Sequence, residues 1–238
     1  TAYGAPFLAD TGITVKQDGS GPSEGAIQAQ FESGKPAWDI VDADPFSAQA
    51  LGKKGMMEPI DYNVVDKTKT REGFGWEYAA SSYFYSYIIA YDAKKYGDNP
   101  PTSMADFFDV EKFPGKRGMY KWGAGMWEAL LMGDGVAPAD LYPLDIERAH
   151  KKLEAFKGNV AGYWGGGAES QSMLMNGDAS MVLVWSTRAK LLEKDSGGDI
   201  SFIWDQGVIA PGSMAVIKGN PGGAEAAMKF IASAQDPA

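Results

Sequence analysis

The stretch WDIVDADPFSAQALGKKGMMEPID, residues 38–61, sets a short β-branched run directly against two aspartates. The apolar pair at 40–41 is typical of a buried strand. Asp42 and Asp44 follow at once, separated by one alanine, and a proline then opens a segment with helical spacing at 45–51. The stretch therefore predicts a strand that leads into a helix, with both carboxylates at the carboxyl end of the strand.

Strand and helix patterns alternate on both sides of this unit. The chain reads as a short helix ending at Gly12, a strand at 13–17, a helix capped by Ser23, the strand at 39–41 and the helix at 45–51. Such alternation predicts βαβ units and a parallel, doubly wound sheet with helices on both faces. An aromatic and β-branched run at 83–91 predicts one long strand, and we place a domain border near residue 90.

Composition narrows the class of function. The 238 residues are 45% hydrophobic, enough for a substantial core, and 31 acidic against 22 basic side chains give a net charge of −9 without a basic stripe. We therefore expect no nucleic-acid partner, and no apolar run reaches the roughly 20 residues of a membrane span. The absence of cysteine and the single His150 argue against metal sites and Ser-His-Asp chemistry. We expect neither a metal nor a cofactor.

Several longer phrases resemble one protein family, and they occur in the family's order along nearly the whole chain. They are FESGKPAWDIVDAD, AYDAKKYGDNPPTSMADFFDVEKFPGKRG, ALLMGDGVAPADLYPLDIERAHKKLEAFK, QSMLMNGDASMVLVW and GSMAVIKGNPGGAEAAMKFIASAQDP. With these phrases the chain resembles the extracellular solute-binding proteins of ATP-driven (ABC) importers, in the branch of the spermidine- and putrescine-binding proteins. Compared with that family, we expect the chain to be truncated at both ends.

The resemblance implies an α/β fold of the type II periplasmic-binding-protein class, with two doubly wound sheets and a cleft between the lobes. Residues 1–90 would form lobe 1, residues 91–210 lobe 2, and residues 211–238 would return to lobe 1. It also implies a small-molecule solute, hinge closure at the crossings near 89–91 and 208–211, and permease subunits as membrane partners. By the same resemblance we expect an exported periplasmic monomer, with its signal peptide removed, that is not an enzyme.

The aspartates of the opening stretch can serve a ligand or a helix. In open parallel sheets, ligands bind outside the carboxyl ends of the strands. The matching loop of the polyamine-binding relatives implies a polar contact at Asp44 and an aromatic platform at Phe46, and an acid beside an aromatic face suits an ammonium group. The alternative is that Asp42 and Asp44 only cap the helix at 45–51.

A cation stands at an unusual place in VLVWSTRAKLLEK. The strand at 181–185 ends at Trp185, Ser186 is the expected N-cap, and Arg188 then lies in the first turn of a helix, where it opposes the helix dipole. A guanidinium beside free helix N–H groups can receive a carboxylate or phosphate. The alternative is a surface salt bridge from Arg188 to Glu193 or to another neighbouring carboxylate.

Aromatic residues of the second lobe lie next to glycines, where the backbone can approach a ligand and a ring can form a wall. From this group, and from the return crossing, we predict ligand contacts for Trp122, Trp127, Trp164, Trp185 and Ser213. Tyr163 belongs to the same group. Core packing is the alternative for these rings. We assign Trp38, Trp76 and Trp204 to core packing, and we read His150 as solvated.

Two departures from the polyamine-binding pattern bear on the solute. Where those relatives imply an acid at the return crossing this chain has Gly212, and where they imply one before a helix it has Gly125. A dication would then lack partners in a partly dry cleft. We rank an amino-acid-like zwitterion such as γ-aminobutyrate (GABA) or a betaine first, then a polyamine, then an organic anion. The distant alternative is a hydrolase using Asp44 with Asp42 or Glu169.

Overall fold

The computed structural model describes residues 3–19 and 23–236. The chain forms two compact units, one made of Thr1–Phe84 with Pro211–Ala238 and the other of Tyr85–Ala210. Two long strands, β3 (Ala80–Asp92) and β7 (Ile200–Ile217), each contribute to both units. The first border lies at residues 84 and 85, inside β3, and not near residue 90, because the long strand passes the border without a break.

In the first unit, β1 (Ile40–Ala43) and β2 (Met57–Glu58) both pair antiparallel with the second half of β7. The helix α3 (Pro45–Lys53) joins β1 to β2 and buries Leu51 against the sheet. The parallel pairing predicted for β1 is therefore wrong, because its partner β7 runs in the opposite direction. The remaining helical elements are α1 (Gly4–Thr11), α2 (Glu24–Glu32), η1 (Lys67–Lys69) and α10 (Ala224–Ser233).

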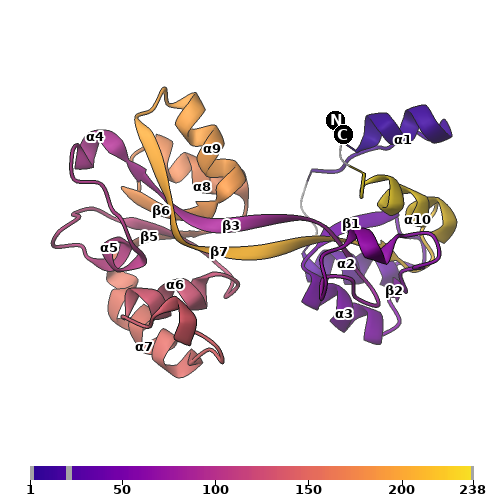
Figure 1. Ribbon diagram of the computed structural model, residues 1–238, viewed down its shortest axis with the longest axis horizontal. Helices are drawn as coiled ribbons and strands as arrows, with labels where there is room; N and C mark the ends of the chain where they lie inside the picture. Colours follow the sequence, from indigo (N-terminus) through magenta and orange to yellow (C-terminus); the bar gives the residue numbers. More distant parts are fainter. Residues whose placement is uncertain (1–2, 20–22, 237–238) are drawn as a thin grey trace. The chain divides into compact units, whose positions relative to one another are not determined.

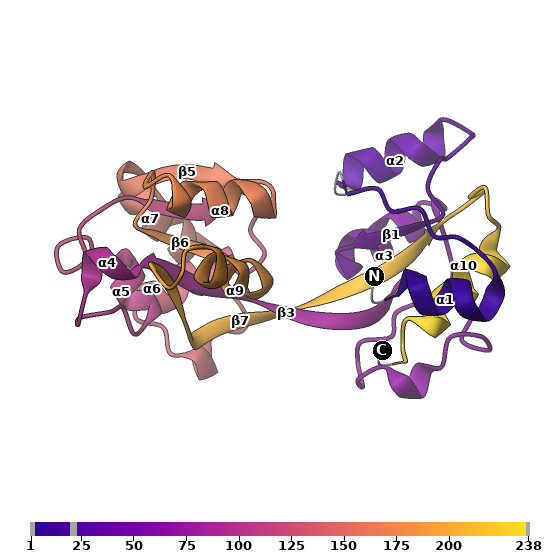
Figure 2. The ribbon, with the colours of Figure 1, turned by 90° about the horizontal axis from the view of Figure 1, so that it is seen from above.

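Local predictions for the first unit have mixed outcomes. The helix α1 ends at Gly12, which is left-handed at φ 73°, and Ser23 caps α2 by accepting from the Ala26 N–H at 3.2 Å, both as predicted. The strand predicted at 13–17 is wrong, since this segment pairs with nothing that the structure describes and Ile13 is exposed. The helix α1 instead packs beside α10 (Figures 1 and 2).

The second unit has the predicted doubly wound layout. Its strands follow the order β3, β6 (Met181–Trp185), β4 (Arg117–Tyr120) and β5 (Val160–Trp164), with β4 parallel to both β5 and β6. On one side of this sheet α8 packs against α9, and on the other α6 packs against α7 (Figure 1). The helical elements are α4 (Ala93–Tyr96), α5 (Met104–Phe108), α6 (Met126–Gly133), η2 (Pro138–Asp140), α7 (Ile146–Phe156), η3 (Lys157–Asn159), α8 (Gly167–Met175) and α9 (Ser186–Asp195).

A buried arginine organises the connection from α5 to β4. Arg117 has no exposed surface, and its guanidinium donates to the carbonyl oxygens of Phe107 at 2.6 Å, Gly115 at 2.6 Å and Phe113 at 2.7 Å. Burial lowers the pKa of Arg117 from its ordinary value. A charged group without water needs such partners, so these carbonyls hold the arginine and the arginine fixes the loop at 109–116.

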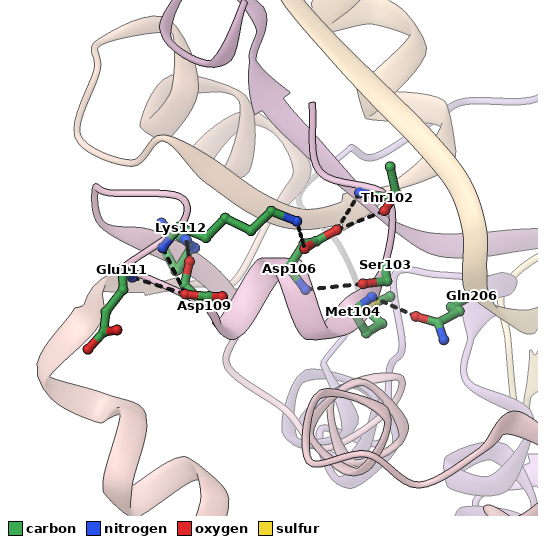
Figure 3. Close-up of polar contacts among 9 residues, drawn as sticks. Thr102, Ser103, Met104, Asp106, Asp109, Glu111, Lys112 and Gln206 are labelled. Carbon is green, nitrogen blue, oxygen red and sulfur yellow. Dashed lines mark hydrogen bonds and ion pairs between the residues drawn. The ribbon is translucent and has the colours of Figure 1, made fainter. Parts of the chain in front are cut away.

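The first turn of α5 is tied to β7 (Figure 3). Gln206 lies within β7 in the left-handed region at φ 58°, a conformation that glutamine rarely adopts. Its Oε1 accepts a hydrogen bond of 2.6 Å from the N–H of Met104, the first residue of α5. The side chain thus supplies an acceptor to an otherwise orphaned helix N–H, which helps to hold the unusual backbone of β7.

Asp106, on the same helix, should make stability depend on acidic pH. Burial tends to raise the pKa of Asp106, but hydrogen bonds from the Thr102 N–H at 2.8 Å and the Lys112 ammonium at 2.9 Å outweigh it and lower the pKa (Figure 3). Its stabilisation should be complete above the unfolded value of about 3.9 and lost as the pH falls through the lower folded value. Urea unfolding from pH 5 to pH 2 should show wild type approaching Asp106→Asn in stability. At pH 5 the exposed control Asp98→Asn should cost much less stability than Asp106→Asn.

Candidate functional site

Three helices of the second unit begin at the carboxyl ends of parallel strands. The strands β4, β5 and β6 lead to α6, α8 and α9, whose N-cap residues are Gly125, Gly166 and Trp185. In none of the three does the N-cap side chain accept a hydrogen bond from the helix, and Ser186, the predicted cap, is instead the first residue of α9. Helix starts of this kind present partially positive N–H groups at one edge of the sheet.

Arg188 lies at two of these helix starts. It occupies the first turn of α9, and its Nη1 donates to Oε1 of Gln171 on α8 at 3.2 Å. A Cβ added to Gly167, the first residue of α8, would lie 2.2 Å from Nε of Arg188. The glycine therefore leaves the space in which the guanidinium crosses the start of α8.

The salt bridge considered for Arg188 is absent. Glu193 accepts from Lys190 at 2.6 Å, and within residues 3–19 and 23–236 no carboxylate forms an ion pair with Arg188. The sequence itself argues against that pair, because residues five apart do not share a helix face. A partly buried guanidinium with one neutral partner beside two helix starts retains donors for an anion.

Aromatic rings pack behind this edge, and one prediction among them needs correction. Trp164 is fully buried, and its Nε1 donates to the Leu183 carbonyl at 3.0 Å. Its ring lies 4.5 Å from that of Tyr120 and 5.0 Å, perpendicular, from that of Trp185. Trp164 is thus a core residue that supports the partly buried Trp185, and its ring offers no surface to a solute.

Trp122 and Trp127 differ in what they can reach. Trp122 is 46% exposed, and the Lys121 ammonium lies 4.2 Å from the centre of its ring. Trp127 is partly buried and its ring lies 4.7 Å from that of His150 on α7, which is exposed as predicted. Trp122 therefore keeps exposed surface that a ligand could reach, whereas Trp127 packs between α6 and α7.

In the first unit, Asp44 serves the helix. It is the N-cap of α3, and its Oδ1 accepts from the N–H groups of Phe46 and Ser47, both at 3.0 Å. Asp44 therefore caps α3, as the second of the two readings predicts. Phe46 beside it is 69% exposed, and its ring lies edge-on to that of Trp76 at 6.4 Å, so it can act as a platform.

Asp42 has a different partner. The hydroxyl of Tyr83 lies 2.8 and 2.7 Å from its two carboxylate oxygens. Asp42 keeps exposed surface, yet the protein atoms around it displace enough water to raise its pKa, which the hydrogen bond from Tyr83 partly offsets. Sequence reasoning missed Tyr83, since 41 residues separate it from Asp42.

Ser213 is not available to a solute as predicted. It is fully buried, and its hydroxyl donates to the Ala43 carbonyl at 2.7 Å, across the register of β1 and β7. The hydroxyl therefore fastens the end of β1 to β7. This is a correction to the predicted ligand contact.

Tyrosine rings occupy the space at Gly212 and Gly125. A Cβ at Gly212 would lie 2.1 Å from the ring of Tyr83, and a Cβ at Gly125 would lie 2.3 Å from the ring of Tyr87. Gly125 also has φ 75°, which a side chain disfavours. Within their own units, both positions are shaped to receive a ring and leave no room for a carboxylate.

Other kinds of site find no support in the described residues. They contain no group of three or more acidic or histidine side chains placed to hold a metal ion. In the same part of the chain, no helix is both long enough and apolar enough to cross a membrane.

Comparison with protein families matches the chain to the bacterial extracellular solute-binding proteins over residues 2–238. The chain belongs to this family. The family comprises substrate-binding proteins of ABC transporters, so membership implies capture of a small solute and interaction with permease components.

Relatives within this solute-binding family include proteins with named solutes. The chain is 32% identical over 242 residues to the γ-aminobutyric acid-binding protein of Pseudomonas aeruginosa, covering 99% of this chain and 68% of that protein. The solved Atu4243–GABA receptor is 39% identical with a TM-score of 0.83, covering 98% and 71% of the two chains. An ABC transporter substrate-binding protein from Bradyrhizobium japonicum is 37% identical with a TM-score of 0.88, covering 98% and 72%.

Proposed function

We propose that this solute-binding protein captures a small zwitterion of the GABA or betaine type for an ABC importer. The observation that carries the proposal is Arg188, a partly buried cation that no described carboxylate neutralises and that lies at the starts of α8 and α9. A planar guanidinium can hold a carboxylate through two parallel hydrogen bonds, and the helix starts favour the same charge. The two relatives named for GABA support this solute class.

The first unit offers groups that suit an ammonium ion. An acid at the end of β1 and the exposed ring of Phe46 offer a charge-assisted hydrogen bond and a cation–π contact. A diamine would need a further acid, and the tyrosine rings over Gly125 and Gly212 occupy both positions where polyamine-binding relatives would supply one. These residues favour a single ammonium over a polyamine.

The protein would be a periplasmic monomer without catalytic activity. Two of the three carboxylates in the hydrolase alternative, those of Asp44 and Glu169, accept hydrogen bonds from the backbone. Asp44 caps α3, and Glu169 accepts from the Gly165 N–H at 2.7 Å. A general acid or base needs its carboxylate available to the reacting group.

Replacing Arg188 tests the proposal. By calorimetry, Arg188→Ala should weaken GABA binding by about 1.5–3 kcal/mol, the value of a hydrogen bond to a charged group, and Arg188→Lys should recover only part. The matched control is Lys190→Ala, which removes an exposed cation of the same helix that already pairs with Glu193. Tight putrescine binding that survives Arg188→Ala would contradict the zwitterion proposal and favour a polyamine.

A further inference from the structure

Asp42 and Asp44 lie at the end of β1, and their carboxylates have different hydrogen-bond partners. Oδ1 of Asp44 accepts hydrogen bonds from two N–H groups at the start of α3. The helix begins with Pro45, and an aspartate followed by proline is typical of a helix N-cap. Asp42 lies two residues earlier on the same strand and caps nothing among the described residues. Its carboxylate meets the hydroxyl of Tyr83 and otherwise keeps exposed surface.

Tyr83 reaches Asp42 only because β7 carries a glycine beneath it. The ring of Tyr83 lies over Gly212, where any side chain would collide with it at 2.1 Å. The strand β7 is held there by two buried contacts, Ser213 Oγ to the Ala43 carbonyl at 2.7 Å and Ser81 Oγ to the Gly212 carbonyl at 3.0 Å. The phenol therefore has a fixed position from which it orients the carboxylate of Asp42.

We propose that Asp42 binds the ammonium group of the solute and that Tyr83 is its positioning residue, with Asp44 serving only the helix. This inference rests on the proposed function, because the solute class proposed there carries an ammonium group. A neutral phenol donor uses part of the carboxylate and leaves its remaining lone pairs for one ammonium. The ring of Tyr83 covers Gly212, so no second carboxylate can stand at that position. Asp42 is then the one acid for the ammonium group, whereas a diamine would need at least two acids. The site should therefore select a solute with a single cationic group.

The test compares Asp42→Asn with Asp44→Asn in the full chain. Both variants remove one negative charge from the end of β1, and asparagine caps helices as well as aspartate does, so α3 remains intact. We expect Asp42→Asn to weaken GABA binding by about 10-fold to 100-fold, as for a lost hydrogen bond between charged groups, and Asp44→Asn to change it by less than about 3-fold. Calorimetry with GABA, and with putrescine as a second amine probe, measures both.

Tyr83→Phe tests whether the Tyr83 hydroxyl orients the Asp42 carboxylate for the solute or only stabilises the fold. It keeps the ring over Gly212 and removes the hydroxyl, so we expect a loss of about 2-fold to 10-fold for GABA, the net worth of one neutral hydrogen bond. The same change in an Asp42→Asn background should cost nothing further, whereas a structural role of the hydroxyl would cost the same in both backgrounds.

Three results would overturn the assignment: a loss at Asp44→Asn equal to or larger than that at Asp42→Asn, an unchanged affinity in Asp42→Asn, or no binding of either amine probe by wild type. Failure of the proposed function looks different. In that case Arg188→Ala would leave affinity intact while Asp42→Asn still weakens the amine that binds, and the Asp42 assignment would stand for another amine-bearing solute.

Discussion

Replacing Arg117 with alanine is expected to destabilise the second unit by about 3–5 kcal/mol, because buried carbonyl oxygens left without donors cost about 1–3 kcal/mol each and a cavity adds to this. The fully buried guanidinium serves the carbonyls of Phe107, Phe113 and Gly115. Without it these oxygens lose their donors in a place that water does not reach, and a cavity of arginine size remains. Urea unfolding monitored by far-UV circular dichroism should show the shift as a lower midpoint.

The neighbouring basic residue provides the control for Arg117. Lys116 is exposed and donates to the Gly158 carbonyl at 2.7 Å, so Lys116→Ala should change stability by less than about 1 kcal/mol. Arg117→Lys should recover only a small part of the lost stability, because one ammonium group cannot donate to all the carbonyl oxygens that the three guanidinium nitrogens reach. Equal unfolding midpoints for Arg117→Ala and Lys116→Ala would contradict the role that we give to Arg117.

Trp164→Ala is expected to cost about 3–5 kcal/mol of stability, the range for removing a large ring from a core. The ring is fully buried between Tyr120 and Trp185, and its N–H bonds to the Leu183 carbonyl. Trp164→Phe keeps an aromatic ring and removes that hydrogen bond, so it should cost less than alanine does. Thermal and urea unfolding of both variants measure the difference.

The neighbouring Tyr163 is the control for Trp164. It is 44% exposed on the same strand, so Tyr163→Ala should cost much less than Trp164→Ala. A ligand-contact role would give the opposite pattern, in which Trp164→Ala keeps the unfolding midpoint of wild type and loses solute affinity. That result would restore the sequence prediction for Trp164.

Much of the fold follows from local pattern, because alternation of strands and helices and cap residues such as Ser23 act over a few residues. The pairing of β1 does not, since its partner β7 lies more than 150 residues away and enters from the opposite direction. Period-2 alternation separates an exposed Tyr163 from a buried Trp164 only once a strand's inner face is known.

In the candidate site, too, local features could be predicted from the sequence and long-range contacts could not. Asp44 followed by Pro45 is a cap signature that can be read locally, and the spacing from Arg188 to Glu193 already argues against an ion pair. Tyr83 and Gly212 escaped prediction as partners because their contact depends on how β3 and β7 lie in the first unit. Arg117 escaped too, since a Lys-Arg pair at a strand start is more typical of a solvated face.

The division of the chain between its units has a consequence for the order in which the protein folds. The second unit is one continuous segment, 85–210, whereas the first is assembled from two segments. On the ribosome, β3, β4, β5 and β6 can pair as soon as they emerge, but β1 and β2 must wait for the end of β7. The strands β1 and β2 therefore remain without their partner β7 until the second unit has been synthesised.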